Sequence, residues 1–356
     1  MSGSSLDGLD ICFAELDENG GKWTYQIKAA SCIAYNDEWV DKLKNAIHLP
    51  TKDYMRLHTA YGRYIGEQVN QFIDAHHLNH QVQLIASHGH TTFHEPQYKM
   101  TAQIGDGAAI AAITGINVVS DLRSIDIALG GQGAPIVPIG EKLLLGDYHY
   151  FLNLGGIANI SANLPNNYIA FDVCSANRVL NMLVKEMGYE YDDRGAIAST
   201  GLVNEILLKA LNDLPFYKKS FPKSLANDYG TDVIYPMIKQ MELSIPDALR
   251  TYTEHIAVQI RDAILLIEDS HINRQSMLVC GGGAFNNFQI ERIKDVLTTL
   301  NIEVTVPEKI LIEFKEALIM ALIGVLRWRE ENNVMNTVTG ATRSSIGGAV
   351  WVGQEA

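Results

Sequence analysis

The sequence is poor in the features that mark secreted, membrane-spanning or nucleic-acid-binding proteins. It has only four cysteines and no CxxC pair, so it favours neither a disulfide framework nor a zinc knuckle and is typical of a reducing cytoplasm. The longest stretch without a charged residue, residues 148–171, contains several asparagines and a proline, which a bilayer would penalise heavily. We therefore expect no membrane span. No basic and apolar leader of the secretory type is visible at the N-terminus.

Positive charge is also scarce. Lysine and arginine number 28 against 41 aspartates and glutamates, which gives a net charge of −13 at pH 7. This excludes a protein that binds nucleic acid through a broad basic face, because phosphate contacts need clustered Lys and Arg. Hydrophobic residues make up 47% of the 356 residues, as in ordinary globular proteins. The length suits two lobes of roughly 150 to 200 residues with a cleft between them.

The apolar pattern alternates between strand-like and helix-like segments. The expected strands are residues 9–16, 23–27, 82–87, 117–120, 148–153, 157–162, 168–172 and 277–280. The expected helices are residues 37–47, 55–73, 106–114, 176–185, 253–268 and one that begins at 286. An Asn-Gly turn joins the first two strands into a hairpin. Strands that alternate with helices predict an α/β fold.

A glycine-dense stretch, residues 130–135, separates two regions of similar architecture. We place the lobe boundary there, which gives an N-terminal lobe of residues 1–135 and a C-terminal lobe of residues 136–341. The last residues, 342–356, are expected to pack back on the N-terminal lobe.

Glycine-rich turns at the ends of expected strands suggest a ligand with phosphate groups. They lie at residues 3–8, 130–133, 155–156 and 281–283. Glycine lets backbone N–H groups converge on an anion. Neither the P-loop motif nor the GxGxxG fingerprint is present. Each turn alone would be interpreted as the tightening of a hairpin; four together favour binding of a nucleotide.

Several charged residues lie at strand ends, where α/β proteins place ligands. Asp7 and Asp10 flank the first loop and could hold Mg²⁺, although an Asp before Gly8 is also a common turn former. Asp172 could be catalytic, or Asp172 or Ser175 could cap the following helix. Arg123 could bind a carboxylate or phosphate, or form a structural ion pair with a neighbouring acid.

Two further groups of residues are assigned no chemistry. His88, His90 and His94 are close in sequence, but a metal site would need further ligands and carboxylates hydrogen-bonded to them, which the sequence does not show. We therefore interpret them as hydrogen-bonding residues rather than metal ligands. Cys174 has no histidine nearby in the sequence, and we interpret it as a small buried thiol rather than a nucleophile.

The motifs taken together resemble those of the anhydro-N-acetylmuramic acid kinase family. In chain order they are SGSSLDGLD, HGHTTFHEP, SDLRSIDIALGGQGAPIVP, LNLGGIANIS, YDDRGAIASTG, FPKS, CGGGAFNN, KEALIMALIG and NTVTGA. Each is weak alone, but the ordered set covers nearly the whole chain. The resemblance implies a two-lobe actin-like ATPase fold of the ribonuclease H-like type, with the active site in the interlobe cleft.

The resemblance also implies a reaction and its residues. The kinase would bind ATP with Mg²⁺, open 1,6-anhydro-N-acetylmuramic acid by hydrolysis and phosphorylate O6, with Asp172 as the general base. Residues implied to contact sugar are Thr91, Arg123 and Glu316, of which Arg123 would bind the lactyl carboxylate. Residues implied to contact ATP are Gly3, Ser4, Ser5, Leu6, Asp7, Gly8, Leu9, Asp10, Gly281, Gly282 and Gly283. A cytoplasmic homodimer is expected by the same resemblance.

The sequence departs from the family pattern in three places. The family carries a strand ahead of the SGTS loop, so either the sheet is short of one strand or the natural chain starts earlier. Ser4 replaces a threonine, and the family's DTGPxN is here Asp172-Val173-Cys174-Ser175-Ala176-Asn177. These departures leave two alternatives: an actin-like ATP-binding sensor or scaffold without kinase turnover, and a kinase for another anhydro-sugar such as levoglucosan.

Overall fold

The chain forms two compact units in the computed structural model, which describes residues 1–3, 5–164, 167–221, 223–226, 228–267 and 275–354. Unit 1 is Met1–Leu145 together with Phe314–Ala356, and unit 2 is Gly146–Glu313. The boundaries expected from sequence, 135/136 and 341/342, differ from these. The reason is packing: the segment after 135 and most of the helix after Phe314 bury Ile139, Ile319 and Leu322 in the core of unit 1.

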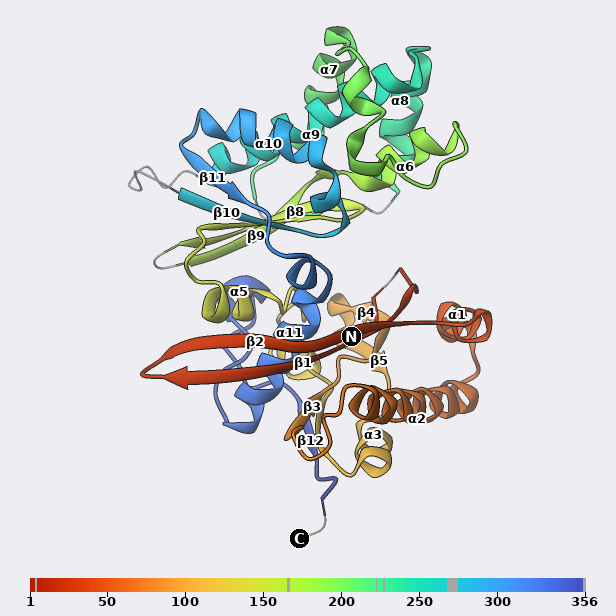
Figure 1. The fold of residues 1–356 in the computed structure, drawn as a ribbon, viewed down its shortest axis with the longest axis vertical. Coiled ribbons are helices and arrows are strands. Elements are labelled where there is room, and N and C mark those ends of the chain that lie inside the picture. Colours follow the sequence, from red (N-terminus) through yellow and green to blue (C-terminus); the bar gives the residue numbers. More distant parts are fainter. Residues whose placement is uncertain (4, 165–166, 222, 227, 268–274, 355–356) are drawn as a thin grey trace. The chain divides into compact units, whose positions relative to one another are not determined.

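Unit 1 carries three small sheets and the helices around them (Figure 1). Its elements are β1 (Gly8–Asn19), β2 (Lys22–Ala34), α1 (Asp37–Lys44), η1 (Ala46–His48), α2 (Thr51–Ala75), β3 (Leu84–Ala86), β4 (His90–Glu95), η2 (Pro96–Tyr98), β5 (Met100–Ile104), α3 (Gly107–Thr114), β6 (Asn117–Ser120), α4 (Ser124–Ala128), α5 (Pro138–Leu144), α11 (Lys309–Trp328) from Phe314 onward, α12 (Asn336–Thr339) and β12 (Ala349–Trp351). The sheets are β1-β2, β12-β6-β3 and β4-β5.

Unit 2 is built on one five-stranded sheet. Its elements are β7 (Tyr150–Leu154), β8 (Ile157–Leu164), β9 (Asn167–Ser175), α6 (Asn177–Lys185), η3 (Asp193–Gly195), η4 (Ala198–Thr200), α7 (Glu205–Asn212), η5 (Pro215–Lys218), η6 (Gly230–Ile234), α8 (Tyr235–Gln240), α9 (Ile245–Ile267), β10 (Gln275–Cys280), η7 (Gly282–Phe285), α10 (Asn287–Thr298) and β11 (Ile302–Thr305). The strand order is β11-β10-β7-β8-β9.

The directions of these five strands define the fold of unit 2. β7, β10 and β11 are parallel, and β7, β8 and β9 form an antiparallel meander. The helix α9 lies against β8 and β9, and α10 lies against β11. Ile256, Ile260 and Ile264, the apolar stripe expected on α9, are buried in the core. The expected α/β class is confirmed.

The hairpin β1–β2 shows how local sequence sets structure. The strands meet at the pair Asn19 and Lys22. Gly20 and Gly21 both have positive φ, +60° and +85°, which the two-residue turn requires and which glycine adopts without steric cost. The Asn-Gly signal therefore places the turn correctly.

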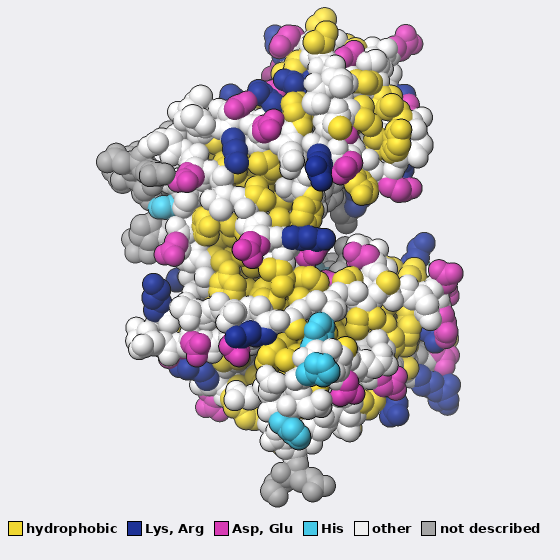
Figure 2. Space-filling model, viewed as in Figure 1, with side chains coloured by type: hydrophobic (Ala, Val, Ile, Leu, Met, Phe, Trp, Pro, Cys, Tyr) yellow, Lys and Arg dark blue, Asp and Glu magenta, His cyan; other side chains and the backbone are white. Residues whose placement is uncertain are grey.

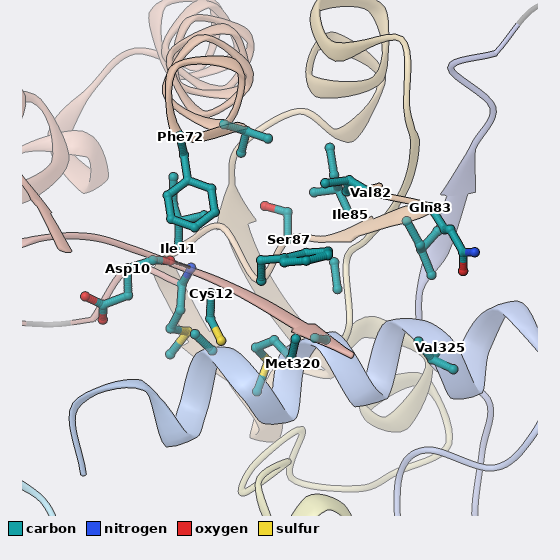
Figure 3. A pocket seen from close by; sticks show the side chains of 18 of the residues that line it. Asp10, Ile11, Cys12, Phe72, Val82, Gln83, Ile85, Ser87, Met320 and Val325 are labelled. Carbon is teal, nitrogen blue, oxygen red and sulfur yellow. Dashed lines mark hydrogen bonds between the residues drawn. The ribbon is translucent and has the colours of Figure 1, made fainter. Parts of the chain in front are cut away.

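A cavity of about 580 Å³ separates β1 from β3 in unit 1 (Figure 3). Its walls include the apolar side chains Ile11, Phe72, Ile85 and Met320, which come from β1, α2, β3 and α11 respectively. The polar side chains Asp10, Gln83 and Ser87 also line it. Among the described residues, no strand pairs with both β1 and β3. In unit 2, by contrast, β7 fills the position between β8 and β10.

The surface carries both acidic and basic side chains, as the composition leads one to expect. On the face drawn in Figure 2, Lys and Arg side chains are distributed over the surface and mixed with acidic side chains. None of the helices described is long and apolar enough to cross a membrane.

Candidate active site

The first glycine-rich loop leads directly into β1. The carboxylate of Asp7 accepts a hydrogen bond from the Ser5 hydroxyl at 2.6 Å and one from the N–H of Gly8 at 3.1 Å. Leu6 has a φ of +57°, so the chain turns sharply there. A side chain at Gly8 would meet the Ile33 carbonyl oxygen at 2.7 Å, on the neighbouring strand. Asp7 thus stabilises the turn, which agrees with the interpretation of this residue as a turn former. Ser4 lies outside the described residues.

A buried hydrogen-bond network that sequence reasoning missed lies behind this loop. The Ser2 hydroxyl lies 3.1 Å from Nδ1 of His90 and accepts a bond from the Tyr35 hydroxyl at 2.9 Å. The Tyr35 hydroxyl also pairs with that of Tyr61, which is fully buried. Burial raises the pKa of Tyr35 to about 12 and that of Tyr61 well above its usual value, so both hydroxyls stay protonated.

Arg123 follows β6 and is held by two neutral partners rather than by an ion pair. Its Nε–H donates to Nε2 of His88 at 2.8 Å, and its Nη1 donates to the Gly133 carbonyl at 2.7 Å. Burial and the adjacent guanidinium lower the pKa of His88 to about 3. The imidazole is therefore neutral, with Nδ1 donating to the Gly89 carbonyl at 3.1 Å. No acid among the described residues forms an ion pair with Arg123, so the structure gives no support to the ion-pair interpretation.

Of the three residues implied to contact sugar, Arg123 and Glu316 interact electrostatically. Glu316, exposed on α11, acts on Arg123 by charge: burial lowers the Arg123 pKa and the Glu316 carboxylate opposes that shift. Beside it in sequence, Lys315 forms a buried ion pair with Glu141 at 2.9 Å. Thr91 is exposed on β4, and no hydrogen bond joins it to Arg123 or Glu316 within the described ranges.

Asp172 lies near the end of β9 in unit 2, next to a β-bulge. Asn159 pairs with Asp172 and Ala158 with Cys174, so Val173 is the extra residue. Oδ2 of Asp172 accepts bonds from the Ser224 hydroxyl at 3.1 Å and the Leu225 N–H at 2.8 Å. No bond to Oδ1 is made by the described residues, so this oxygen is left to accept a proton.

The FPKS motif is therefore what fixes Asp172, a role that sequence spacing could not show. The backbone also joins the two segments, because the Asp172 N–H donates to the Lys223 carbonyl at 3.1 Å. The helix-cap interpretation is wrong for both Asp172 and Ser175. The N-cap of α6 is Ala176, and neither side chain caps that helix.

The glycine-rich turns of unit 2 gather at the carboxyl ends of β7 and β10. The turn after β10 borders a cavity of about 490 Å³ lined in part by Asn177, Gly282, Gly283 and Phe285. Asn177 Nδ2 donates to the Leu154 carbonyl at 2.9 Å, so this side chain ties the start of α6 to the end of β7. A side chain at Gly283 would meet Leu154 Cβ at 2.7 Å and Asn177 Oδ1 at 2.9 Å. Sequence reasoning did not assign Asn177 to this cavity.

The three histidines were interpreted as hydrogen-bonding residues, and the structure confirms their hydrogen bonds. His88, His90 and His94 all form hydrogen bonds with neighbouring groups. The described part of the chain brings together no group of three or more His, Cys, Asp or Glu side chains that could hold a metal ion. Cys174 is fully buried, and burial raises its pKa, so its thiol is not an activated nucleophile.

The five-stranded sheet, with glycine turns at the carboxyl ends of its central parallel strands, is that of an α/β protein of the actin-like, ribonuclease H-like class. The family model for anhydro-N-acetylmuramic acid kinase matches residues 1–353. The chain belongs to this family.

Curated relatives agree along nearly their whole length. The chain is 31% identical over 364 residues to the anhydro-N-acetylmuramic acid kinase of a Sulfurovum species, covering 99% of this chain and 98% of the relative. It is also 31% identical over 370 residues to the one of Photobacterium profundum, covering 99% and 97%. Among solved structures, component A of the (R)-2-hydroxyglutaryl-CoA dehydratase of Acidaminococcus fermentans matches with a TM-score of 0.41 and 13% identity, covering 86% of this chain and 95% of that one.

Proposed function

We propose that this protein is an ATP-dependent kinase of peptidoglycan recycling that acts on 1,6-anhydro-N-acetylmuramic acid. It opens the internal anhydro bond by hydrolysis and phosphorylates O6, which gives N-acetylmuramic acid 6-phosphate and ADP. Membership of the kinase family supports the reaction class and the use of ATP. The assignment of the catalytic base is supported by the Asp172 carboxylate. Ser224 and the Leu225 N–H orient it through Oδ2, and no described residue donates to Oδ1.

Asp172 acts as the general base in the hydrolytic half of the reaction. Oδ1 takes a proton from water as the water oxygen bonds to the anomeric carbon and the bond from C1 to O6 breaks. O6 then attacks the γ-phosphorus, and the bond from that phosphorus to the oxygen of ADP breaks. One carboxylate suffices because phosphoryl transfer to O6 replaces protonation of the leaving oxygen. Binding the two substrates with their reacting atoms aligned supplies the rest of the rate acceleration, since positioning dominates phosphoryl transfer.

ATP is held by two sets of glycines in this proposal. The loop from Gly3 to Asp10 binds the phosphates through backbone N–H groups and the serine hydroxyls. The cavity beside Gly281, Gly282 and Gly283 takes another part of the nucleotide, because it is concave and partly apolar, with the Phe285 ring and the Asn177 amide in its walls.

Mg²⁺ accompanies ATP, and the donors present fit a magnesium ion that is held mainly by phosphates. Mg²⁺ commonly keeps several waters and takes only one or two carboxylates besides substrate phosphates. Asp7 and Asp10, at the start of β1, would hold it directly or through water. When bound, the ion neutralises charge on the transferring phosphoryl group. Asp7 meanwhile holds the loop turn through Ser5 and Gly8.

Arg123 recognises the lactyl carboxylate of the sugar. Its Nε and one Nη1 donor are occupied by His88 and Gly133, which fixes the guanidinium plane and leaves further N–H donors for a ligand. Glu316 and Thr91 contact sugar hydroxyls. The proposal also includes a cytoplasmic location and a homodimer, both carried by the family resemblance.

Turnover in ¹⁸O-water tests the proposed reaction. The protein is incubated with ATP, Mg²⁺ and 1,6-anhydro-N-acetylmuramic acid, and the products are analysed by mass spectrometry. We expect one heavy oxygen on the C1 hydroxyl of the phosphosugar and none in its phosphate. ATP binding without any phosphosugar would support a sensor or scaffold instead. Turnover of levoglucosan, which has no carboxylate, in preference to the amino sugar would support the other anhydro-sugar kinase.

A further inference from the structure

The backbone of Gly133 is held from both sides by two charged residues of opposite sign. Its N–H donates to Oδ2 of Asp126 at 2.8 Å, and its carbonyl accepts from Nη1 of Arg123 at 2.7 Å. Asp126 is fully buried in α4, three residues beyond Arg123. The backbone of Gly133 therefore connects the side chains of Asp126 and Arg123 through two hydrogen bonds.

The glycines of this loop are required for the approach to Asp126. A side chain at Gly131 would meet Oδ2 of Asp126, and the Gly131 N–H donates to the Asp126 carbonyl at 2.9 Å. Gly133 has a φ of +65°, and a side chain there would meet Ile127 Cδ1 at 2.7 Å. The loop thus closes on Asp126 only because both positions lack Cβ.

A distant segment holds the other oxygen of the same carboxylate. The Thr339 hydroxyl donates to Oδ1 of Asp126 at 2.7 Å, and the Thr339 carbonyl accepts from the Gln132 N–H at 2.8 Å. Thr339 is 1% exposed, at the end of α12 in the NTVTGA motif. This threonine therefore fixes both the carboxylate and the loop that the carboxylate holds.

We propose that Asp126 and Thr339 are positioning residues for Arg123. They act through Gly133, and with His88 they set the plane of the guanidinium, so that the remaining N–H donors face one direction. The inference rests on the proposed function in assigning Arg123 to the lactyl carboxylate. It gives the NTVTGA motif a role at the sugar site although Thr339 does not touch sugar.

Replacement of Thr339 tests the proposal with little change in volume. Thr339→Val removes the hydroxyl, and we expect the KM for 1,6-anhydro-N-acetylmuramic acid to rise about tenfold, the effect of losing one hydrogen bond to a charged group. The KM for ATP stays unchanged, and Thr339→Ser restores the sugar KM because it keeps the hydroxyl. 1,6-Anhydro-N-acetylglucosamine, which lacks the carboxylate, shows no such rise. Thr114→Val removes a threonine hydroxyl that donates to the Ile110 carbonyl and accepts from the Ile116 N–H, at the end of α3. It is the matched control and leaves both KM values unchanged.

A second measurement does not depend on activity. The ¹H–¹⁵N NMR signal of Arg123 Nε, assigned by its loss in Arg123→Lys, reports the bond to His88. We expect it to shift in Thr339→Val and to keep its position in Thr339→Ser and Thr114→Val. An unchanged signal overturns the positioning role, whatever the enzyme's activity. A shifted signal with an unchanged sugar KM overturns the link to substrate. Absence of any turnover by the unaltered chain would refute the proposed function, and the NMR result would still decide the positioning role.

Discussion

The Nε–H of Arg123 donates to Nε2 of His88 at 2.8 Å, and this bond requires a neutral imidazole. Burial and the Arg123 charge supply that neutrality by lowering the His88 pKa to about 3. The histidine is therefore a fixed acceptor across the physiological pH range. Arg123 is hydrogen-bonded to uncharged partners, His88 and the Gly133 carbonyl, and these bonds leave further N–H donors for a ligand.

Arg123→Lys is expected to weaken sugar binding selectively. Lysine keeps the charge but has neither the planar fork nor the donors that now reach both His88 and Gly133. We expect the KM for 1,6-anhydro-N-acetylmuramic acid to rise roughly 10- to 100-fold, from a loss of about 1.5–3 kcal/mol. Steady-state kinetics with each substrate varied in turn would measure this. An equal rise in the KM for ATP would contradict the assignment of Arg123 to the sugar.

Asp172→Asn is expected to lower kcat by roughly 10²–10⁴-fold, the usual contribution of a general base. The amide keeps the size of the side chain but cannot take a proton from water. Binding of ATP, followed by calorimetry, is expected to stay unchanged. Asp213→Asn, at an exposed carboxylate of the same unit that pairs with Lys218, is the control and should keep full activity. Near-normal turnover of Asp172→Asn would refute the assigned base.

Ser224→Ala tests whether the FPKS motif orients that base. The variant removes the hydroxyl that donates to Oδ2 of Asp172 and leaves the Leu225 N–H in place. We expect kcat to fall about tenfold, as for one lost hydrogen bond to a carboxylate, with little change in either KM. Ser199→Ala removes an exposed hydroxyl bonded to the Ala196 carbonyl and serves as the control. If kcat were the same in both variants, the proposal that Ser224 orients the base would be contradicted.

Local signals in the sequence located the strands and helices that were expected, but they missed others such as β4, β5, α4 and α7. The strand 117–120 has the bounds expected of it, and the Asn-Gly turn sets the register of β1 and β2, because both depend on residues adjacent in the chain. Asp172 was identified as a strand-end carboxylate for the same reason. Its partner Ser224, however, lies 52 residues away, and Thr339 lies 213 residues from Asp126.

Such long-range pairs cannot be predicted from one sequence, because no local pattern encodes which loops meet. The unit boundary differed for a related reason. Helix α11 has the apolar pattern of any core helix, and only the packed structure shows that Ile319 and Leu322 belong to the core of unit 1. Burial of Asp126 was likewise invisible, since an aspartate followed by a glycine-rich loop is usually exposed.

Two neighbouring glycines are expected to respond differently to alanine. At Gly283 the added methyl group would meet Leu154 Cβ at 2.7 Å, whereas at Gly282 the nearest atom is Asn177 Nδ2 at 3.8 Å. Gly283→Ala should therefore lower the thermal unfolding midpoint by several degrees, for a cost of about 1–3 kcal/mol from overpacking, and raise the KM for ATP. Gly282→Ala should leave the midpoint almost unchanged. Equal midpoints would show that the turn has room at both positions.

The stability of unit 2 is expected to fall in acid because of His255. This fully buried imidazole lies 2.6 Å from Asn212 Oδ1 and 3.1 Å from the Tyr217 hydroxyl, and burial lowers its pKa to about 3 from 6.5. The unfolded chain therefore binds a proton between pH 6.5 and 3 that the folded chain does not. The stabilisation is fully present above pH 6.5 and is lost toward pH 3, by at most about 1.4 kcal/mol per pH unit.

Two measurements test this expectation. NMR of the His255 ring should show no titration down to about pH 4, which requires no variant. In urea unfolding from pH 7 to pH 5, His255→Asn should show a shallower loss of unfolding free energy than the unaltered chain, because the group that binds the extra proton on unfolding is gone. His48→Asn, at an exposed histidine, should keep the steeper loss. A His255 ring that titrates near pH 6.5 in the folded protein would contradict the prediction, since the imidazole would then be protonated without unfolding.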